Sequence, residues 1–361
     1  MKKKICIATP VDYSNFGNRL QNYAVHVICK RMNMEPTTLA VEYSYILGFI
    51  PKYFILRIIS FFHLSKLLSK LSKLKSVNKS YASWKFTRSE IKTIYIKNIK
   101  DYNRIVGAFD YYGIGGDQIL SPYWKHMIPF ATFLGNDAEK KICFSPSFGS
   151  DSLSSDYIDE IMKELNQINH IAIREQSGVD TIAQSIGKKS LRICDPVVML
   201  TREDWISVSE KTDLKNNYRK SIVYFLGEDC VEYQKYITED ADRNQCILVD
   251  ISRNSTSKES SCDPFEFIAL INQSECVYTD SFHAIMIALI LNKRVVIFQR
   301  KGGEEMNTRI SELVERYNIE NCLYSDNENS SHLGYYDHEK VNIILQSERK
   351  IAEEYYEQFT K

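Results

Sequence analysis

The stretch YTDSFHAIMIALILNKRVVIF, residues 278–298, decides the fold class of this chain. It begins at the end of an apolar strand, passes through a polar turn into a strongly apolar helix, and ends in a second apolar strand. Asp280 or Ser281 in the turn is the expected N-cap of the helix. A strand, a helix and another strand in this order indicate a parallel sheet covered by helices.

The alternation of strand and helix continues on both sides of this stretch. Pro196 stops one strand, and the pair Asp263-Pro264 starts a helix with Asp as N-cap and Pro in the first position. The expected strands lie within residues 6–8, 37–44, 109–118, 140–149, 170–175, 190–196, 221–227, 246–252, 275–280 and 294–299, and the expected helices lie within 19–32, 155–169, 176–186, 263–273, 281–292 and 338–358.

The length of 361 residues is too great for one ordinary hydrophobic core, so two domains are expected. The boundary is expected between Pro196 and Ser221, in a charged stretch without a strand pattern. The predicted division is an N-terminal domain of residues 1–200, a C-terminal domain of residues 201–340 and a C-terminal helix of residues 341–361.

Composition excludes several classes of protein. Hydrophobic residues make up 44% and charged residues 25% of the chain, which is typical of a folded globular protein. Lys plus Arg equal Asp plus Glu at 46 each, so the chain is not a uniformly basic nucleic-acid binder, and no nucleic-acid partner is expected. The P-loop, dinucleotide-binding, H-E-x-x-H and G-x-S-x-G motifs are all absent from the sequence.

The nine cysteines show no C-x-x-C spacing, so neither a zinc ribbon nor a thioredoxin motif is indicated, and no metal is expected. Several of them lie within apolar runs, where cysteine is commonly a small buried hydrophobe. The beginning MKKKICIATPVDYSN has too short an apolar stretch for a signal peptide and reads as a first strand. We therefore expect a cytoplasmic protein.

Residues 44–89 contain nine basic residues and no acidic residue. Leu64, Leu67 and Leu71 share one helical side and Lys66 and Lys70 the other, so a basic amphipathic helix is predicted here. One interpretation is that this insertion lies on an anionic membrane surface as a peripheral anchor. The other is an ordinary helix that packs its leucines on the core. A transmembrane span is not expected, because Lys52 and Arg57 would lie near its middle.

Polar loops follow several predicted strands, where ligands of parallel sheets bind. Two of the loops in the first domain supply candidates, and each of these loops has a simple turn as its alternative interpretation. The candidates are Asn15, Gly17, Asn18 and Gln21 at the start of the first helix, and Gly116, Asp117 and Gln118 at the end of the strand expected within 109–118.

Two further candidates are basic side chains, an arginine and a histidine. Arg174 ends a strand and can form a bidentate clamp for an anion, the alternative being a structural salt bridge with Glu175 or another acid. His283 lies in the first turn of the apolar helix, where the free N–H groups favour an anion and an imidazole can move protons. Its alternative is a local capping bond.

Taken together, these loops resemble the polysaccharide pyruvyl transferase family. The resemblance covers roughly residues 5 to 320 and is strongest at DSFH, residues 280–283. The matching motifs, in order, are NFGNRLQNYAVH, GIGGDQI, SFG, IAIREQSGVD, CDPV, YTDSFHAIMIALILNKRVVIF and NTRISELVERY.

The resemblance implies two Rossmann-like domains facing each other across a cleft, the GT-B type of architecture, with the C-terminal helix crossing back to the N-terminal domain. It also implies phosphoenolpyruvate as co-substrate without a further cofactor, and a saccharide acceptor, which can be lipid-linked, in cell-surface polysaccharide biosynthesis. The product would be a pyruvate ketal bridging two sugar hydroxyls.

In this interpretation the donor lies on the C-terminal side and the acceptor on the N-terminal side. His283 and Asp117 are the expected catalytic residues. Some relatives carry a second donor arginine where this chain has Ser281, so Arg309 or Arg300 would have to supply that charge. The donor-binding candidates are Arg174, Asp280, Ser281 and Arg309, and the acceptor-binding candidates are Asn15, Gly17, Asn18, Gln21, Gly116 and Gln118.

Two other functions fit the same sequence features. A GT-B type glycosyltransferase that uses a nucleotide sugar would share the two-domain architecture. A non-catalytic, membrane-associated scaffold of polysaccharide assembly would use the basic insertion without any turnover.

Overall fold

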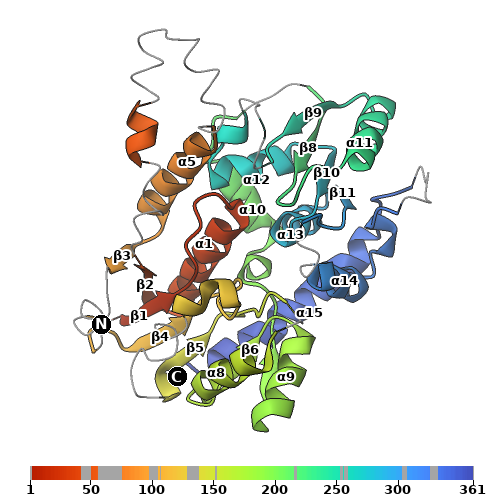
Figure 1. Ribbon diagram of the computed structural model, residues 1–361. Helices are drawn as coiled ribbons and strands as arrows, with labels where there is room; N and C mark the ends of the chain where they lie inside the picture. The colour runs from red at the N-terminus through yellow and green to blue at the C-terminus, as the bar shows by residue number, and fades with distance from the viewer. Residues whose placement is uncertain are drawn as a thin grey trace.

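The computed structural model contains two parallel sheets with helices packed around them (Figure 1). The structure describes residues 2–41, 50–55, 75–96, 105, 107–127, 138–150, 153–214, 218–252, 255, 259–302, 307–325 and 332–360.

The first sheet has five strands in the order β3-β2-β1-β4-β5, and every pairing in it is parallel. Its central strand is buried over Ile5 to Ala8, which is expected of a parallel strand covered on both faces. The strands are β1 (Lys3–Ala8), β2 (Met34–Val41), β3 (Thr93–Ile96), β4 (Tyr111–Ile114) and β5 (Lys141–Cys143), and a separate parallel pair follows as β6 (Ile171–Ile173) and β7 (Ser190–Arg192).

Helix α1 connects the first two strands and begins where the sequence provides an N-cap. The side-chain oxygen of Asn15 accepts a hydrogen bond from the backbone N–H of Asn18, and Lys30 and Arg31 lie in the last turn, where they complement the helix dipole. The other helices of the first half are α5 (Lys75–Glu90), α8 (Ser155–Leu165) and α9 (Gln176–Ile186), with α1 spanning Phe16–Arg31.

The second sheet has four parallel strands in the order β11-β10-β8-β9. Its helix α12 shows the predicted start: Asp263 and Glu266 form a capping box, with Pro264 in the first turn. The strands are β8 (Lys220–Tyr224), β9 (Ile247–Asp250), β10 (Cys276–Thr279) and β11 (Arg294–Ile297), and the helices are α10 (Arg202–Ser209), α11 (Val231–Arg243), α12 (Pro264–Asn272), α13 (Phe282–Ile290) and α14 (Asn307–Tyr317).

These two sheets confirm the expected α/β class with two Rossmann-like units. The strand–helix–strand expectation for residues 278–298 is met by β10, α13 and β11, and every residue of α13 after Phe282 is buried. Among the described strands and α-helices, those that were not predicted at their positions are β3, α5, α10, α11 and α14. The division at residue 200 stays a prediction.

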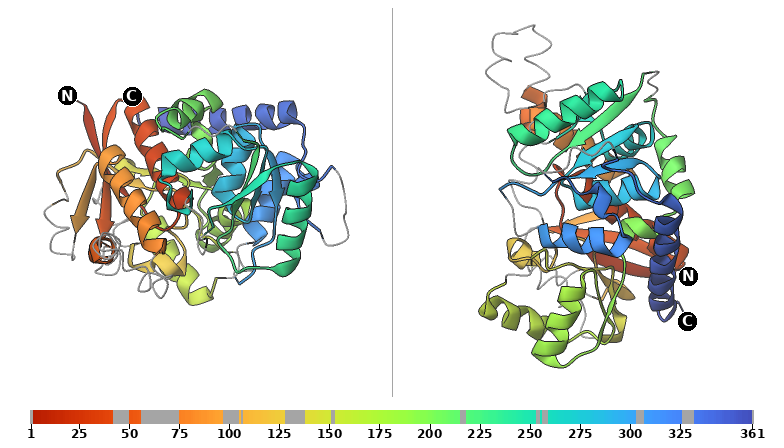
Figure 2. Two further views of the ribbon diagram at one scale, coloured as in Figure 1. Left: turned by 90° about the horizontal axis from the view of Figure 1, so that it is seen from above. Right: turned by 90° about the vertical axis from the view of Figure 1, so that its right-hand side faces the viewer.

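The C-terminal helix α15 (His338–Glu357) crosses back to the first half of the chain, as predicted (Figure 2). Arg192 pairs with Glu348 at 2.8 Å, and the ring of Phe144 stacks on that of Tyr356. The hydroxyl of Tyr355 accepts a hydrogen bond from the N–H of Cys143 at 3.0 Å and donates one to the carbonyl of His170 at 2.9 Å. Helix α15 is therefore attached to the first half through polar bonds that are buried or partly buried.

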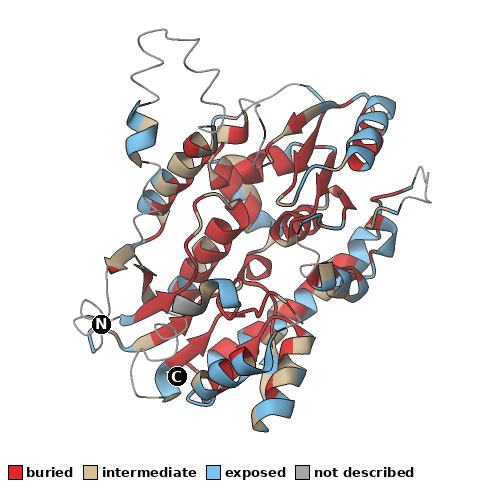
Figure 3. Cartoon of the chain, viewed as in Figure 1, coloured by how far each residue is buried: buried red, intermediate tan, exposed pale blue. Residues whose placement is uncertain are grey.

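Only part of the basic insertion lies among the described residues. The predicted leucine and lysine faces at 64–74 lie outside them. The described helix α5 buries Val77, Ser83 and Phe86 on its inner side, and Figure 3 shows buried and exposed residues alternating along it. Both interpretations of the leucine face stay predictions. None of the described helices is both long enough and apolar enough to span a membrane.

Removing the Tyr355 hydroxyl should weaken the attachment of α15. The Tyr355→Phe substitution removes the bond to the buried N–H of Cys143 and the bond to the partly buried carbonyl of His170, at a cost of about 1–3 kcal/mol. Urea unfolding followed by circular dichroism should show a lower midpoint for this variant. Tyr123→Phe, at a side chain that is 73% exposed, should leave the midpoint unchanged. Equal midpoints for both variants would contradict the assigned role of α15.

Candidate functional site

The predicted loops meet where the strands of both sheets end. Gly17, in the first turn of α1, packs directly against His283 in the first turn of α13. A Cβ atom at Gly17 would lie 2.5 Å from the Cβ, Cγ and Nδ1 atoms of His283, which is impossible without movement. Glycine at position 17 is thus what allows the two halves to approach each other at the histidine.

Asp195 lies at the centre of the site and is fully buried. Its Oδ2 atom lies 2.6 Å from Nη2 of Arg174 and 3.5 Å from Nε2 of His283. Its Oδ1 atom accepts a hydrogen bond from the N–H of Val197 at the start of a 3-10 helix, residues Pro196–Met199. Burial alone would raise the pKa of this carboxyl, but Arg174 and His283 outweigh it and hold the pKa well below its usual range.

Arg174 is 3% exposed at its side chain and pairs with Asp195 through one nitrogen only. Its Nε and Nη1 atoms have no hydrogen-bond partner among the described residues. A buried donor without an acceptor costs about 1–3 kcal/mol, so such groups mark a place where a ligand supplies acceptors. The structural salt bridge considered for Arg174 does exist, and it still leaves part of the guanidinium available.

Two guanidinium groups lie close to the ring of Phe282. The Cζ atoms of Arg174 and Arg309 each lie 5.1 Å from the centre of its ring. Arg309, on α14, also pairs with Glu175 at 3.6 Å, and its Nε and Nη2 atoms lack hydrogen-bond partners within the described part of the chain. Burial and the nearby Arg174 lower the pKa of Arg309 to about 10, so it remains a cation at neutral pH.

Asp117 adds a second buried carboxylate on the N-terminal side. It has a left-handed backbone with φ of 69°, which a non-glycine residue adopts rarely and at functional sites more than elsewhere. Its Oδ2 accepts a hydrogen bond from Nδ2 of Asn18 at 2.7 Å. Burial would raise its pKa, but His283, Arg174 and the Asn18 bond lower it, so the carboxylate is ionised at neutral pH.

Arg300 and Arg309 were the two candidates for the charge missing at Ser281. Arg300 is bound to Asp280: its Nε lies 3.4 Å from the Asp280 carboxylate, and its Nη2 donates to the Asp280 carbonyl. Arg309 pairs with Glu175 through Nε, but it lies against Phe282 and lines the same pocket as Arg174, and its Nη2 atom has no hydrogen-bond partner among the described residues, so it is the arginine that faces the site. The Oγ atom of Ser281 is buried and has no hydrogen-bond partner among the described residues.

The carboxylate of Asp280, a predicted donor-binding residue, binds backbone N–H groups. Its two carboxylate oxygens accept hydrogen bonds from the N–H groups of Leu226 and Gly227, each at 2.8 Å. These bonds fix the loop after β8 to the turn before α13, so Asp280 positions the turn that contains Ser281.

The remaining acceptor-side candidates are held by hydrogen bonds and packing within the first half. Gln21 donates to Thr9, whose hydroxyl donates to the carbonyl of Gly116, so the two predicted loops are joined through Thr9 by one chain of bonds. The side chain of Asn15 is occupied as the N-cap of α1. Gln118 is half-buried and packs beside Gly149.

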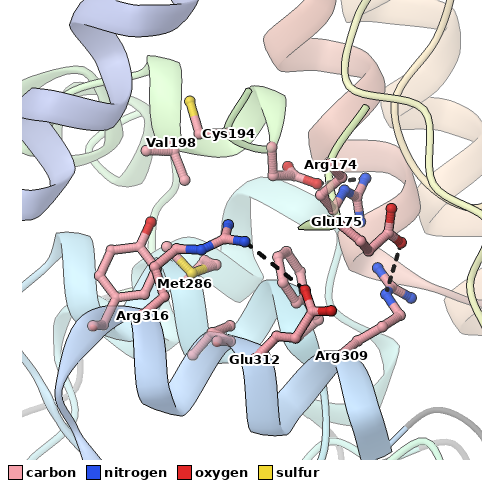
Figure 4. A pocket seen from close by; sticks show the side chains of 12 residues that line it. Arg174, Glu175, Cys194, Val198, Met286, Arg309, Glu312 and Arg316 are labelled. Atoms are coloured by element: carbon pink, nitrogen blue, oxygen red, sulfur yellow. Dashed lines mark ion pairs between the residues drawn. The ribbon is translucent and has the colours of Figure 1, made fainter. Parts of the chain in front are cut away.

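A pocket opens beside this cluster, between α13, α14 and the end of β6 (Figure 4). Arg174, Glu175 and Arg309 gather at one end of it, and Glu312 and Arg316 at the other. The full lining consists of Arg174, Glu175, Cys194, Asp195, Val198, Phe282, Met286, Arg309, Glu312, Leu313, Arg316 and Tyr317. Within the described ranges, no group of three or more His, Cys, Asp and Glu side chains is arranged to hold a metal ion.

Two residues of the site were absent from the sequence candidates. Asp195 precedes Pro196, the same Asp-Pro signal that correctly marked the start of α12, so a buried N-cap was recognisable there. Glu175 was considered only as a partner of Arg174. In the structure it accepts a hydrogen bond from Ser147 and pairs with Arg309.

The stability of the fold should depend on the ionised Asp195. Replacing it by asparagine leaves Arg174 without its counter-charge, at a cost of about 3–5 kcal/mol at neutral pH. Because the folded-state pKa is depressed, this contribution is complete above the unfolded pKa of about 3.9 and is lost as the pH falls below it.

The free energies of unfolding of wild type and Asp195→Asn should therefore differ most near neutral pH and converge below about pH 4. The exposed control Asp159→Asn should match wild type at every pH. A difference that does not change with pH would contradict the assignment of the buried charge.

Comparison with solved structures finds distant similarity over nearly the whole chain. A complex of S. aureus MnaA with UDP has 12% identity and a TM-score of 0.47, covering 100% of this chain and 91% of that one. A trehalose-phosphate synthase from Burkholderia vietnamiensis has 9% identity and a TM-score of 0.45, covering 99% and 93%. Heptosyltransferase II of E. coli has 10% identity and a TM-score of 0.35, covering 96% and 99%.

The comparison with curated proteins finds no match. A family model does match, under the description polysaccharide pyruvyl transferase, over residues 15–302. The matched range contains the loops of Gly17, Asp117, Arg174, Asp195 and His283. It leaves out Arg309. This chain belongs to the polysaccharide pyruvyl transferase family.

Proposed function

We propose that this protein transfers a pyruvyl group from phosphoenolpyruvate to a saccharide as a cyclic ketal. The observation that supports this most is the pair of buried guanidinium groups, Arg174 and Arg309, with unpartnered N–H donors beside His283. Phosphoenolpyruvate carries a phosphate and a carboxylate on three carbons, so it supplies the acceptors that these donors lack.

The donor anions would be held on the C-terminal side of the site. Arg174 offers Nε and Nη1, Arg309 offers Nε and Nη2, and the N-terminus of α13 adds the hydroxyl of Ser281 and a favourable dipole. Asp195 keeps Arg174 in place and cancels part of the positive charge when no ligand is bound. In this arrangement Arg309 takes the role of the arginine that some relatives carry at the position of Ser281.

The reaction needs one proton donor and one proton acceptor. In the first step the methylene carbon of phosphoenolpyruvate takes a proton and becomes a methyl group, and positive charge develops on the adjacent carbon. A saccharide hydroxyl attacks that carbon and loses its proton, phosphate leaves, and a second hydroxyl closes the ring. Of the two hydroxyl protons, one balances the proton gained by the methyl group and the other leaves with the phosphate.

His283 and Asp117 are suited to these two roles. His283 lies against the N-terminal half at Gly17, between the donor side and the acceptor side, and is our candidate for the acid. Asp117 is an ionised carboxylate on the acceptor side, held by Asn18, and is our candidate for the base that receives a hydroxyl proton. Polar groups of Gln21, Gly116 and Gln118 would border the saccharide.

Donor binding can be tested without knowing the saccharide. Phosphoenolpyruvate should raise the melting temperature of wild type, since a ligand at 100 times its Kd stabilises the fold by about 2.7 kcal/mol. Arg309→Gln should lose most of that shift, whereas Arg202→Gln, at an exposed position on α10, should retain it. A shift produced by uridine or guanosine diphosphate, with none from phosphoenolpyruvate, would contradict the proposal in favour of a nucleotide-sugar transferase.

Turnover tests the roles of His283 and Gly17 together. With phosphoenolpyruvate and a panel of lipid-linked saccharides, His283→Asn should reduce phosphate release by about 10²–10⁴-fold. Gly17→Ala should reduce it about 100-fold by displacing the imidazole.

If Gly17 acts through His283, the Gly17→Ala change should have little further effect in the His283→Asn background, less than about threefold. Additive losses in the double variant would show that Gly17 acts independently of His283. Unchanged turnover in His283→Asn would remove this residue from the mechanism.

A further inference from the structure

The helical segment 50–55 lies beside α5 (Figure 1), and exposed residues occur on both (Figure 3). Aromatic side chains of the two segments pack on one another. The ring of Tyr53 stacks on that of Tyr81 with 3.6 Å between centroids, and Tyr81 lies 5.5 Å from Trp84. At the tip, Phe54 and Ile55 are 55% and 54% exposed. Two adjacent large apolar side chains this exposed, next to a row of aromatic rings, indicate a surface that contacts something apolar.

Three cations lie on the same two helical segments as this apolar tip, and one of them, Lys85, acts electrostatically on Asp263. Lys52, Lys85 and Arg88 are exposed, and the Arg88 guanidinium lies 5.0 Å from the ring of Trp84. None of the three forms an ion pair with a carboxylate within the described part of the chain. The sequence around them, residues 44–89, has nine basic residues and no acidic one. We call the apolar tip and these three cations the aromatic–basic face.

The inner side of α5 connects this face to the loops of the site. Lys79 is buried, with its Nζ atom 4.1 Å from the ring centre of Phe16 and 5.0 Å from that of Tyr224 at the end of β8. Phe16 immediately precedes Gly17, the residue that packs on His283. A molecule bound to the outer side of α5 is therefore one helix diameter away from the acceptor-side loop.

We infer that the aromatic–basic face binds the surface of an anionic bilayer. Phe54 and Ile55 would enter the boundary between headgroups and acyl chains, and Tyr53, Tyr81 and Trp84 have the amphipathic rings that gather at that depth. Lys52, Lys85 and Arg88 would lie among the anionic headgroups. A neutral or apolar protein partner would leave this excess of positive charge uncompensated, so the charge pattern selects a lipid surface.

Bilayer binding would place the enzyme beside a lipid-linked saccharide. This last step rests on the proposed function, because it assumes a saccharide acceptor. The binding itself does not: a chain with no pyruvyl transfer would still bind vesicles, and failure to bind vesicles would leave donor binding by Arg174 and Arg309 unaffected.

The test is co-sedimentation of the full chain with vesicles of phosphatidylglycerol and phosphatidylcholine, and with vesicles of phosphatidylcholine alone. Wild type should bind the anionic vesicles, and binding should fall as salt is raised. Lys52→Gln/Lys85→Gln/Arg88→Gln should lower the partition coefficient about 100-fold, since each basic residue near an anionic surface contributes about fivefold. Phe54→Ser/Ile55→Ser should lower it at least about tenfold.

Matched controls remove similar groups from other surfaces. Val231→Ser/Ile343→Ser deletes two apolar side chains that are 81% and 61% exposed, and Lys235→Gln/Lys350→Gln deletes two exposed charges. Both should bind as wild type does. The inference would be overturned if wild type did not bind the anionic vesicles, or if both test variants bound them as strongly as wild type does. Dimers that Phe54→Ser/Ile55→Ser converts to monomers, without vesicle binding, would assign the face to a second copy instead.

Discussion

The buried carboxylate of Asp195 is the interaction on which the site depends. It comes from the junction between the two halves, and it faces Arg174 from the first half and His283 from the second. Without a negative charge at this point, a guanidinium and an imidazole would face each other in a region that excludes water, which is costly. Asp195 therefore lets the two halves approach closely enough for Gly17 to touch His283, and it leaves the outer N–H groups of Arg174 free.

Much of the fold could be predicted because local signals and tertiary packing agree. The strand–helix–strand run at 278–298, the Asp263-Pro264 start of α12 and the helix at 176–186 all have strong periodicity or capping residues, and each was found where it was expected. The missed elements differ in this respect. Strand β3 has only four residues and is half-exposed, so it shows no clear hydrophobic period. Helices α11 and α14 do carry a helical period, and α10 begins with a capping box at Thr201, so these three helices could have been predicted.

The site was predicted only in part, and for a physical reason. Loop position alone suggested Asp117, Arg174 and His283, because parallel strands end at one edge of a sheet. It could not show which acid neutralises Arg174, because that depends on contacts between residues far apart in sequence. Nor could it separate Arg300 from Arg309, which differ only in their neighbours: Arg300 is bound to Asp280, whereas Arg309 pairs with Glu175, lies on Phe282 and lines the same pocket as Arg174.

Three parts of the molecule act together. The carboxylate of Asp195 lies between Arg174 of the first half and His283 of the second. Loops at the strand ends place buried cations beside His283, and α5 lies between the loop of Phe16 and an exposed aromatic and basic surface. We propose that the donors of Arg174 and Arg309 bind the two anionic groups of one small molecule. A crystal structure of the protein with phosphoenolpyruvate tests it most directly. We predict phosphate and carboxylate oxygens within hydrogen-bond distance of Arg174 and Arg309, with the methylene carbon facing His283. Phosphoenolpyruvate bound elsewhere, with both arginines unoccupied, would contradict the account.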